Sequence, residues 1–305
     1  MIVFCTSLHS VYVLTHLTTS PLLQQQQQYT QYEPTIAVAV LVTPNSSTYW
    51  NRFVAMSAGW YRHFEVVKGY SFHPVAFKQD SRLIQVEKLF STEKTISRED
   101  VQHNMHVAAF QRMRGDTNDT STNTSDWYLQ VDDDTVLVPA NLRRLVRLLD
   151  PSEAVLLGKC AVYQDSVEGR ILFVVGVGGI LMSRALMLAL EPHFPACRRR
   201  YNRVFFADAR VGACVSHTLN QSSAVCRYNT APDGDVVAGG RRWSFTNRNV
   251  RIEAAEHAPQ DLVVSMHEKA PSRTRLLNRY VQNLTERGIE VTWGAMTLMM
   301  DEDDY

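Results

Sequence analysis

The stretch that decides the fold is Asp126–Leu149, which reads DWYLQVDDDTVLVPANLRRLVRLL. Its first part, Trp127–Val131, has the apolar pattern of a short buried strand and leads directly into the acidic triplet Asp132–Asp134. Adjacent carboxylates at the end of a core strand repel one another unless a cation neutralises them, and hard divalent ions take oxygen ligands. The stretch therefore predicts a core strand that ends at a divalent-cation site. An acidic surface turn is the simpler alternative.

The residues around this stretch predict an α/β domain. Thr35–Thr43 is a continuous apolar run of strand length and predicts a buried, parallel strand. A helical pattern then runs to Phe64, Pro74–Phe77 is a second candidate strand, and Glu99–Met113 predicts another helix. This alternation is typical of a mostly parallel central sheet with helices on both faces. Ligands of such sheets bind beyond the carboxyl ends of the strands, which is where the acidic triplet falls.

The second half of the chain predicts shorter and more mixed elements. An amphipathic helix begins near Pro139, a residue suited to the first helical position. The other expected elements are strands at Ala154–Leu157, Arg170–Val175 and Leu262–Met266 and helices at Ile180–Leu190 and Arg273–Leu284.

Length and charge set the domain organisation and exclude one class of partner. The 305 residues suffice for one large domain, and 31 basic against 31 acidic side chains give no electrostatic footprint for nucleic acid. We expect a leader or stem over 1–34, one domain over 35–290 and an acidic tail over 291–305. No charged side chain precedes Glu33. The apolar runs before it are too short for a standard membrane span, so a signal, a truncated anchor and a disordered leader all fit.

Cysteines and sequons favour the secretory pathway. Four cysteines follow the leader, which permits two disulfides in three pairings, and none has the CxxC spacing of a zinc site. Five N-x-Ser/Thr sequons occur, two of them in the polar loop 115–125. The cysteines are Cys160, Cys197, Cys214 and Cys226, and the sequons begin at Asn45, Asn118, Asn123, Asn220 and Asn283.

Three further patches are candidates for chemistry. Gly176–Gly179 lets backbone approach a ligand closely, although a tight turn explains it equally well. Asp208 follows apolar residues, so it suits a general base or, as the simpler reading, a helix N-cap. His267 ends a predicted strand, where it is either a structural histidine or a ligand that shares the ion of the acidic triplet.

The order of these motifs resembles the Fringe and core-1 β1,3-galactosyltransferase family. The resemblance covers roughly 35–271 and is most specific at Asp126–Leu142, which matches a D-W-x-x-x-x-D-D-D-T stretch followed by an Asn-Leu helix. Met182-Ser183-Arg184-Ala185-Leu186 continues the match. Members of this family are glycosyltransferases of the GT-A fold and typically type II membrane proteins of the Golgi. The resemblance implies a GT-A-like domain with a nucleotide-binding part at about 35–150 and an acceptor part at about 151–290.

The resemblance also implies a role for each candidate residue. The acidic triplet would be the DxD-type motif that binds a UDP-sugar and Mn²⁺, with Asp134 and His267 as direct metal ligands. Asp208 would take the proton from the acceptor hydroxyl. The residues implied are Asp132, Asp133, Gly176, Gly178 and Gly179 for the nucleotide sugar, Asp132, Asp134 and His267 for the metal, and Asp208 for catalysis.

Two departures from the family pattern favour a rival interpretation. Val177 stands where the family has Gly, and Ala207 stands where it has a second acid. We expect an inverting transfer of a hexose or N-acetylhexosamine from a UDP-sugar to a glycan or glycoprotein hydroxyl, with a β1,3 linkage. The alternative is an inactive relative that acts as a folding partner or glycan-binding protein. A metal-dependent phosphodiesterase fits less well, since it needs more histidine or acidic ligands than the motifs offer.

Overall fold

The computed structural model describes residues 33–42, 51, 55, 59–71, 86–88, 98–116, 125–231, 233–249, 257–268 and 270–302. Residues from Pro34 onward form one compact unit. The expected strand at Pro74–Phe77 and nearly all of the expected leader lie outside the described residues.

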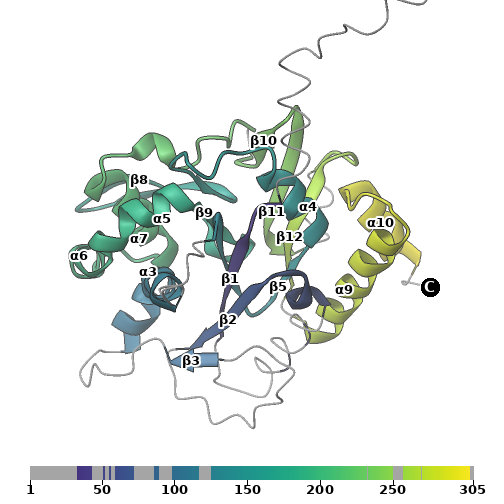
Figure 1. Ribbon diagram of the computed structural model, residues 1–305, viewed down its shortest axis with the longest axis horizontal. Helices are drawn as coiled ribbons and strands as arrows, with labels where there is room; N and C mark the ends of the chain where they lie inside the picture. Colours follow the sequence, from purple (N-terminus) through teal and green to yellow (C-terminus); the bar gives the residue numbers. More distant parts are fainter. Residues whose placement is uncertain are drawn as a thin grey trace, which may run out of the picture. The chain divides into compact units, whose positions relative to one another are not determined.

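A six-stranded sheet forms the centre of this unit (Figure 1). Its strand order is β3 (Val86–Lys88), β2 (Val66–Ser71), β1 (Ile36–Leu41), β4 (Trp127–Asp132), β9 (Ile180–Ser183) and β6 (Leu156–Leu157). The pairings β3–β2, β2–β1 and β1–β4 are parallel, whereas β9 runs antiparallel to both β4 and β6. The fold is therefore mixed α/β, and the mostly parallel central sheet that we predicted is not confirmed.

The register of the two central strands places the acidic triplet. Residues Ile36 to Leu41 of β1 are all buried, as their continuous apolar sequence predicts. Ile36 lies opposite Trp127 and Leu41 lies opposite Asp132, so both strands end at the same edge. The acidic triplet thus begins at the carboxyl edge of the parallel strands, where such sheets bind ligands.

The predicted helix Ile180–Leu190 is partly wrong. Its first four residues form β9, and helix α5 begins only at Arg184 and ends at Leu190. The Ser183 side chain caps this helix by accepting a hydrogen bond from the Leu186 backbone N–H. The run before Ser183 is buried between β4 and β6, and periodicity alone cannot tell so short an apolar run from a helix.

A second sheet carries the other candidate ligand. Its order is β10 (Val236–Ala238), β11 (Arg241–Asn249), β12 (Leu262–His267) and β5 (Thr135–Leu137). Because β5 pairs antiparallel with β12, His267 lies opposite Thr135. The chain passes from β4 in one sheet to β5 in the other through Asp133 and Asp134, so the acidic turn joins the two sheets.

Helices cover both faces of the central sheet. One face packs against α3 (Arg98–Asp116), α5, α6 (Phe194–Arg200) and α7 (Ala207–Ala213), and also against the hairpin of β7 (Cys160–Asp165) and β8 (Gly169–Val174). The other face packs against α4 (Pro139–Val146) and the second sheet. Beyond the second sheet lie α9 (Pro271–Glu286) and α10 (Trp293–Glu302), drawn in yellow in Figure 1.

The end of the described chain is helical. Residues 291–305, which we expected to form an acidic tail, include helix α10. Trp293 and Met296 are buried in the same apolar cluster as α9, and this burial stabilises the helix despite the acidic residues after it. No helix in the described part of the chain is long and apolar enough to span a membrane.

Two disulfides connect the elements around α7. Cys197 of α6 bonds Cys214 at the end of α7, and Cys160 of β7 bonds Cys226. The sequence left three pairings open, and the fold selects this one. A cross-link that closes a loop of 17 residues stabilises a protein by about 3 kcal/mol in the chain-entropy account. The helix that carries Asp208 is therefore fixed at its far end.

Candidate active site

The acidic triplet is a buried turn. Asp133 and Asp134 are both buried, and Oδ1 of Asp132 is shielded from solvent without a hydrogen-bond partner among the described residues. Burial, followed by the charges of Asp134, Asp133 and Asp208, raises the pKa of Asp132 well above its usual range. The acidic surface turn considered above therefore does not fit. A carboxylate in this setting is stabilised by a neighbouring cation.

Asp134 and His267 meet at one point, although they lie 133 positions apart in the chain. Nε2 of His267 lies 3.1 Å from Oδ2 of Asp134. Backbone contacts fix both residues: the Glu268 N–H donates to the Asp134 carbonyl at 3.0 Å, and the His267 N–H donates to the Thr246 hydroxyl at 3.0 Å. The expected convergence of these two side chains is present.

The donor set fits a hard divalent ion. Two ligands at right angles on an octahedral ion, each about 2.1 Å from it, lie about 3.0 Å apart. The nitrogen–oxygen distance of 3.1 Å between His267 and Asp134 agrees with that spacing. Oδ1 of Asp132 is a further shielded oxygen without a hydrogen-bond partner in the described residues, but it does not lie within 4.8 Å of both the Asp134 and the His267 ligand atoms. Mn²⁺ accepts both imidazole and carboxylate ligands, so these residues suit it.

Asp208 lies in the first turn of α7 and faces the glycine-rich turn. Its Oδ2 accepts a hydrogen bond from the Gly176 N–H at 2.9 Å, and its Oδ1 accepts one from the Ala209 N–H at 2.9 Å. Its charge also contributes to the raised pKa of Asp132. The carboxylate is thus near the acidic triplet but belongs to a different wall of the site.

The glycine-rich turn needs glycine at positions 176, 178 and 179 but not at position 177, where this chain has valine. A Cβ on Gly176 would lie 2.7 Å from the His106 ring, and one on Gly178 would lie 2.9 Å from the Thr246 carbonyl oxygen. Gly179 has a φ of 101°, which side chains disfavour. Val177 is only partly buried, and its carbonyl accepts a hydrogen bond from the Thr135 hydroxyl at 3.1 Å. The side chain of Val177 therefore leaves the turn intact and bound to the acidic loop.

Sequence reasoning missed His106 and Gln130. His106 Nδ1 lies 2.5 Å from Oε1 of Gln130, and the Gln130 amide donates to the His106 carbonyl at 3.2 Å. Burial lowers the pKa of His106, which the charge of Asp208 partly opposes. The ring of the buried His106 packs closely against the backbone of Gly176. The signal in the sequence was a histidine on the buried face of α3.

Asp126, the first residue of the acidic motif, has a structural role. Its carboxylate accepts hydrogen bonds from the Thr35 N–H and hydroxyl, each at 2.9 Å, and from the Arg184 guanidinium at 2.6 Å. It therefore ties the start of β1 to the start of β4 and to α5. These bonds explain why Asp126 and Arg184 occur together in the motif.

A second cluster of possible ligands lies elsewhere, at Asp233, Asp235 and His257. Lys159 and Arg242 already neutralise its charge. The Lys159 ammonium lies 3.1 Å from Asp235, and the Arg242 guanidinium contacts both aspartates. With two cations in place, the cluster is a structural ion network and we assign it no metal.

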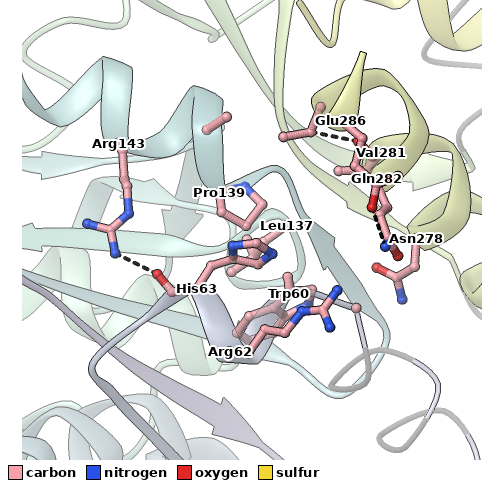
Figure 2. A pocket seen from close by; sticks show the side chains of 13 residues that line it. Trp60, Arg62, His63, Leu137, Pro139, Arg143, Asn278, Val281, Gln282 and Glu286 are labelled. Carbon is pink, nitrogen blue, oxygen red and sulfur yellow. Dashed lines mark hydrogen bonds between the residues drawn. The ribbon is translucent and has the colours of Figure 1, made fainter. Parts of the chain in front are cut away.

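A separate cavity of about 210 Å³ lies between α9 and the start of α4 (Figure 2). Trp60 and Leu137 line it, and Arg143 at its rim donates to the His63 carbonyl at 2.5 Å. None of the candidate site residues lines this cavity. Its link to the site is indirect, through the Trp60 indole N–H, which donates to the Thr135 carbonyl at 3.2 Å.

Replacing Asp132 by asparagine should stabilise the metal-free protein. The change removes a buried carboxylate with a raised pKa, for an expected gain on the order of 1 kcal/mol in the free energy of unfolding. A carboxyl whose pKa is raised on folding favours the folded state at acidic pH and loses that effect as pH rises through its folded pKa. The advantage of asparagine should therefore grow above about pH 4 in thermal unfolding.

Asp126→Asn is the matched control for this prediction. It removes the same charge from a carboxylate that is fully hydrogen-bonded, so it should destabilise the protein by about 1–3 kcal/mol. If Asp132→Asn lowers the melting temperature as much as Asp126→Asn does, Asp132 is not an uncompensated charge.

Comparison with known proteins agrees with the motifs. The Fringe-like family model matches residues 76–227, a range that holds the acidic triplet, the glycine-rich turn and Asp208 but ends before His267. The crystal structure of a glycosyltransferase involved in the glycosylation of the major capsid of PBCV-1 is similar at 11% identity, over 61% of this chain and 76% of that chain, with a TM-score of 0.33. That score is too low to carry an argument about this chain. The family match supports a glycosyltransferase activity, and it confirms the resemblance to the Fringe-like family that the acidic and glycine-rich motifs predict.

Proposed function

We propose that the protein is a metal-dependent, inverting glycosyltransferase. It moves a hexose or N-acetylhexosamine from a UDP-sugar to a hydroxyl of a glycan or glycoprotein acceptor, with a β1,3 linkage. The observation that carries the proposal is the 3.1 Å contact between Asp134 and His267, which lies in the same acidic turn as the shielded Asp132 Oδ1. These residues would hold Mn²⁺, which when bound offsets the negative charge that builds on the departing diphosphate.

We assign the other residues of the acidic turn and the glycine-rich turn to binding of the donor, the nucleotide sugar. Asp132 and Asp133 belong to the same buried turn, and the backbone of Gly176, Gly178 and Gly179 allows a ligand to approach closely. The hydrogen bond between the Thr135 hydroxyl and the Val177 carbonyl holds these two walls together. We assign both walls to the nucleotide sugar. Walls joined in this way would orient the sugar for the reaction.

Asp208 would act on the acceptor side. Its two backbone hydrogen bonds hold the carboxylate in one orientation, with lone pairs left to accept the proton of an attacking hydroxyl. Attack from the side opposite the departing UDP inverts the anomeric carbon, so the base and the metal ligands must lie on different walls. The position of Asp208 on α7 and of His267 on β12, two different elements, supports this arrangement.

The secretory pathway, with the Golgi as the expected compartment, suits this activity. Two disulfides form in an oxidising compartment, and the described sequons at Asn220 and Asn283 are exposed. The division into a nucleotide-binding part before about residue 150 and an acceptor part after it also belongs to the proposal. So does a possible membrane anchor before Glu33.

The test is a screen of UDP-galactose, UDP-N-acetylglucosamine and UDP-glucose for Mn²⁺-dependent hydrolysis, together with calorimetry of UDP and Mn²⁺. We expect UDP to bind only when Mn²⁺ is present and one donor to be hydrolysed. Absence of UDP binding with Mn²⁺ would instead favour the inactive folding partner.

A further inference from the structure

The cavity between η1 (Tyr61–His63), the start of α4 and helix α9 is large enough for a small ligand (Figure 2). Its volume is about 210 Å³, and a protein cavity of about 150 Å³ already holds a benzene ring. Gly59 permits the close approach of α9, since a Cβ there would lie 2.4 Å from the Asn278 side chain. Helix α9 lines the cavity with residues that share one side of the helix, because they recur three or four positions apart. They are Asn278, Val281, Gln282, Thr285 and Glu286.

The apolar part of the lining is fixed in place. Trp60, Leu137 and Val281 line the cavity and are buried. The Trp60 indole N–H donates to the Thr135 carbonyl at 3.2 Å, and the indole ring meets Phe64 edge to face with centroids 5.8 Å apart. Because its one polar group is already hydrogen-bonded, Trp60 offers a ligand only apolar surface. The volume and this lining together suit an apolar body of about one ring.

Two arginines line the same cavity. Arg62 is exposed and makes no ion pair within the part of the chain that the structure describes. Arg143 contacts Glu65 at 3.2 Å, but Glu65 is exposed, and ion pairs of this kind contribute little. Burial lowers the pKa of His63, and the charges of Arg62 and Arg143 lower it further, so both guanidinium groups act on the same place. Of the lining residues, Glu286 is the one acid, and it belongs to α9.

This distribution of charge indicates the polar end of the ligand. The Arg143 guanidinium donates to the His63 carbonyl at 2.5 Å, which joins α4 to η1 on the side of the cavity that faces α9 (Figure 2). A guanidinium group matches a carboxylate, because it donates two parallel hydrogen bonds to the two oxygens. A neutral ligand would leave Arg62 without a partner of opposite charge, whereas an anion provides one.

We propose that this cavity binds a small amphipathic carboxylate. Its ring or short alkyl chain packs against Trp60, Leu137 and Val281, and its carboxylate pairs with Arg62 and Arg143. The site is separate from the candidate active site, because none of the residues assigned to the nucleotide sugar, the metal or catalysis lines it. The inference therefore does not depend on the proposed function.

The role of the charge is tested by saturation-transfer NMR with phenylacetate, 3-phenylpropionate and octanoate, and with the primary amide of each. We expect at least one carboxylate to bind the wild type and its amide to bind about tenfold more weakly. Arg62→Ala should weaken binding of the carboxylate by about tenfold and leave binding of the amide unchanged, since the amide has no charge. Arg279→Ala serves as the control, because Arg279 is exposed on α9 but does not line the cavity, and it should have no effect.

The location of the site is tested by Ala140→Trp. Ala140 is an exposed lining residue in the first turn of α4, so a large side chain there would occlude the cavity without entering the core. We expect this variant to unfold cooperatively on heating and to bind neither the carboxylate nor the amide.

Any of four results would overturn the assignment. No carboxylate binds the wild type, the amide binds as tightly as its carboxylate, or Arg62→Ala or Ala140→Trp binds the carboxylate as the wild type does. The fourth is displacement of the carboxylate by UDP with Mn²⁺, which would place it in the candidate active site instead.

Discussion

Asp134→Ala should lower Mn²⁺-dependent UDP-sugar hydrolysis by at least about 10³-fold. The change removes the Asp134 carboxylate, which lies 3.1 Å from Nε2 of His267, so the imidazole would be left without the second proposed metal ligand. The effect should be on turnover and on metal affinity together, because in the proposed mechanism the bound ion would also neutralise the diphosphate. Steady-state hydrolysis over a Mn²⁺ titration measures both.

Asp150→Ala is the control for this prediction. Asp150 is exposed. Its carboxylate accepts hydrogen bonds from the backbone N–H and the hydroxyl of Ser152, in its own turn. It should change neither the Mn²⁺ dependence nor the rate. Unchanged hydrolysis in Asp134→Ala would remove this residue from the metal site.

Asp208→Asn should leave UDP binding intact and reduce sugar transfer by about 10²–10⁴-fold. Asparagine has the same shape, and its side-chain oxygen can still accept the hydrogen bond from the Gly176 N–H. The glycine-rich turn should therefore keep its position while the proton acceptor is lost. Calorimetry of UDP with Mn²⁺ checks the first part, and transfer to the best acceptor checks the second.

The outcome of this variant separates a base from a residue that only holds the glycine-rich turn, since the N-cap of α7 is Phe206 and not Asp208. If Asp208 only supported the turn, the isosteric amide would preserve transfer, since its oxygen can still accept the hydrogen bond from the Gly176 N–H. Full transfer activity in Asp208→Asn would therefore reduce Asp208 to a structural residue. A loss of both binding and transfer would show that the charge positions the donor as well.

The elements next to the site could be predicted from the sequence because their signals were local. The apolar run of β1, the strand of β4 and the helix that begins at Pro139 each appear where the pattern placed them. Other elements depend on tertiary contacts. Strand β2 (Val66–Ser71) includes Lys68 and Gly69 and was missed, because its pairing with β1 and burial at one end define it.

The site residues also fall into two groups: some could be predicted from local sequence, and the position of others depends on tertiary contacts. The acidic triplet and Asp208 were visible as charges in apolar surroundings, and His267 was visible as a histidine at the end of a predicted strand. The family resemblance implied the role of each. The distance between Asp134 and His267 could not be predicted, because it depends on the antiparallel pairing of β5 with β12 across 132 positions. His106 was missed because nothing in its sequence neighbourhood shows that Gly176 would pack against its ring. The pairing of the cysteines likewise follows from the fold and not from their spacing.

The central claim is that one ion binds both Asp134 and His267. Pulsed EPR of the Mn²⁺–UDP complex tests it directly, because a coordinated imidazole produces a nitrogen coupling that oxygen ligands do not. We predict this coupling in the wild type, its loss in His267→Ala, and its retention in His63→Ala, which changes an exposed histidine at the separate cavity. A wild-type spectrum without the nitrogen coupling, or a coupling that survives in His267→Ala, would contradict the account.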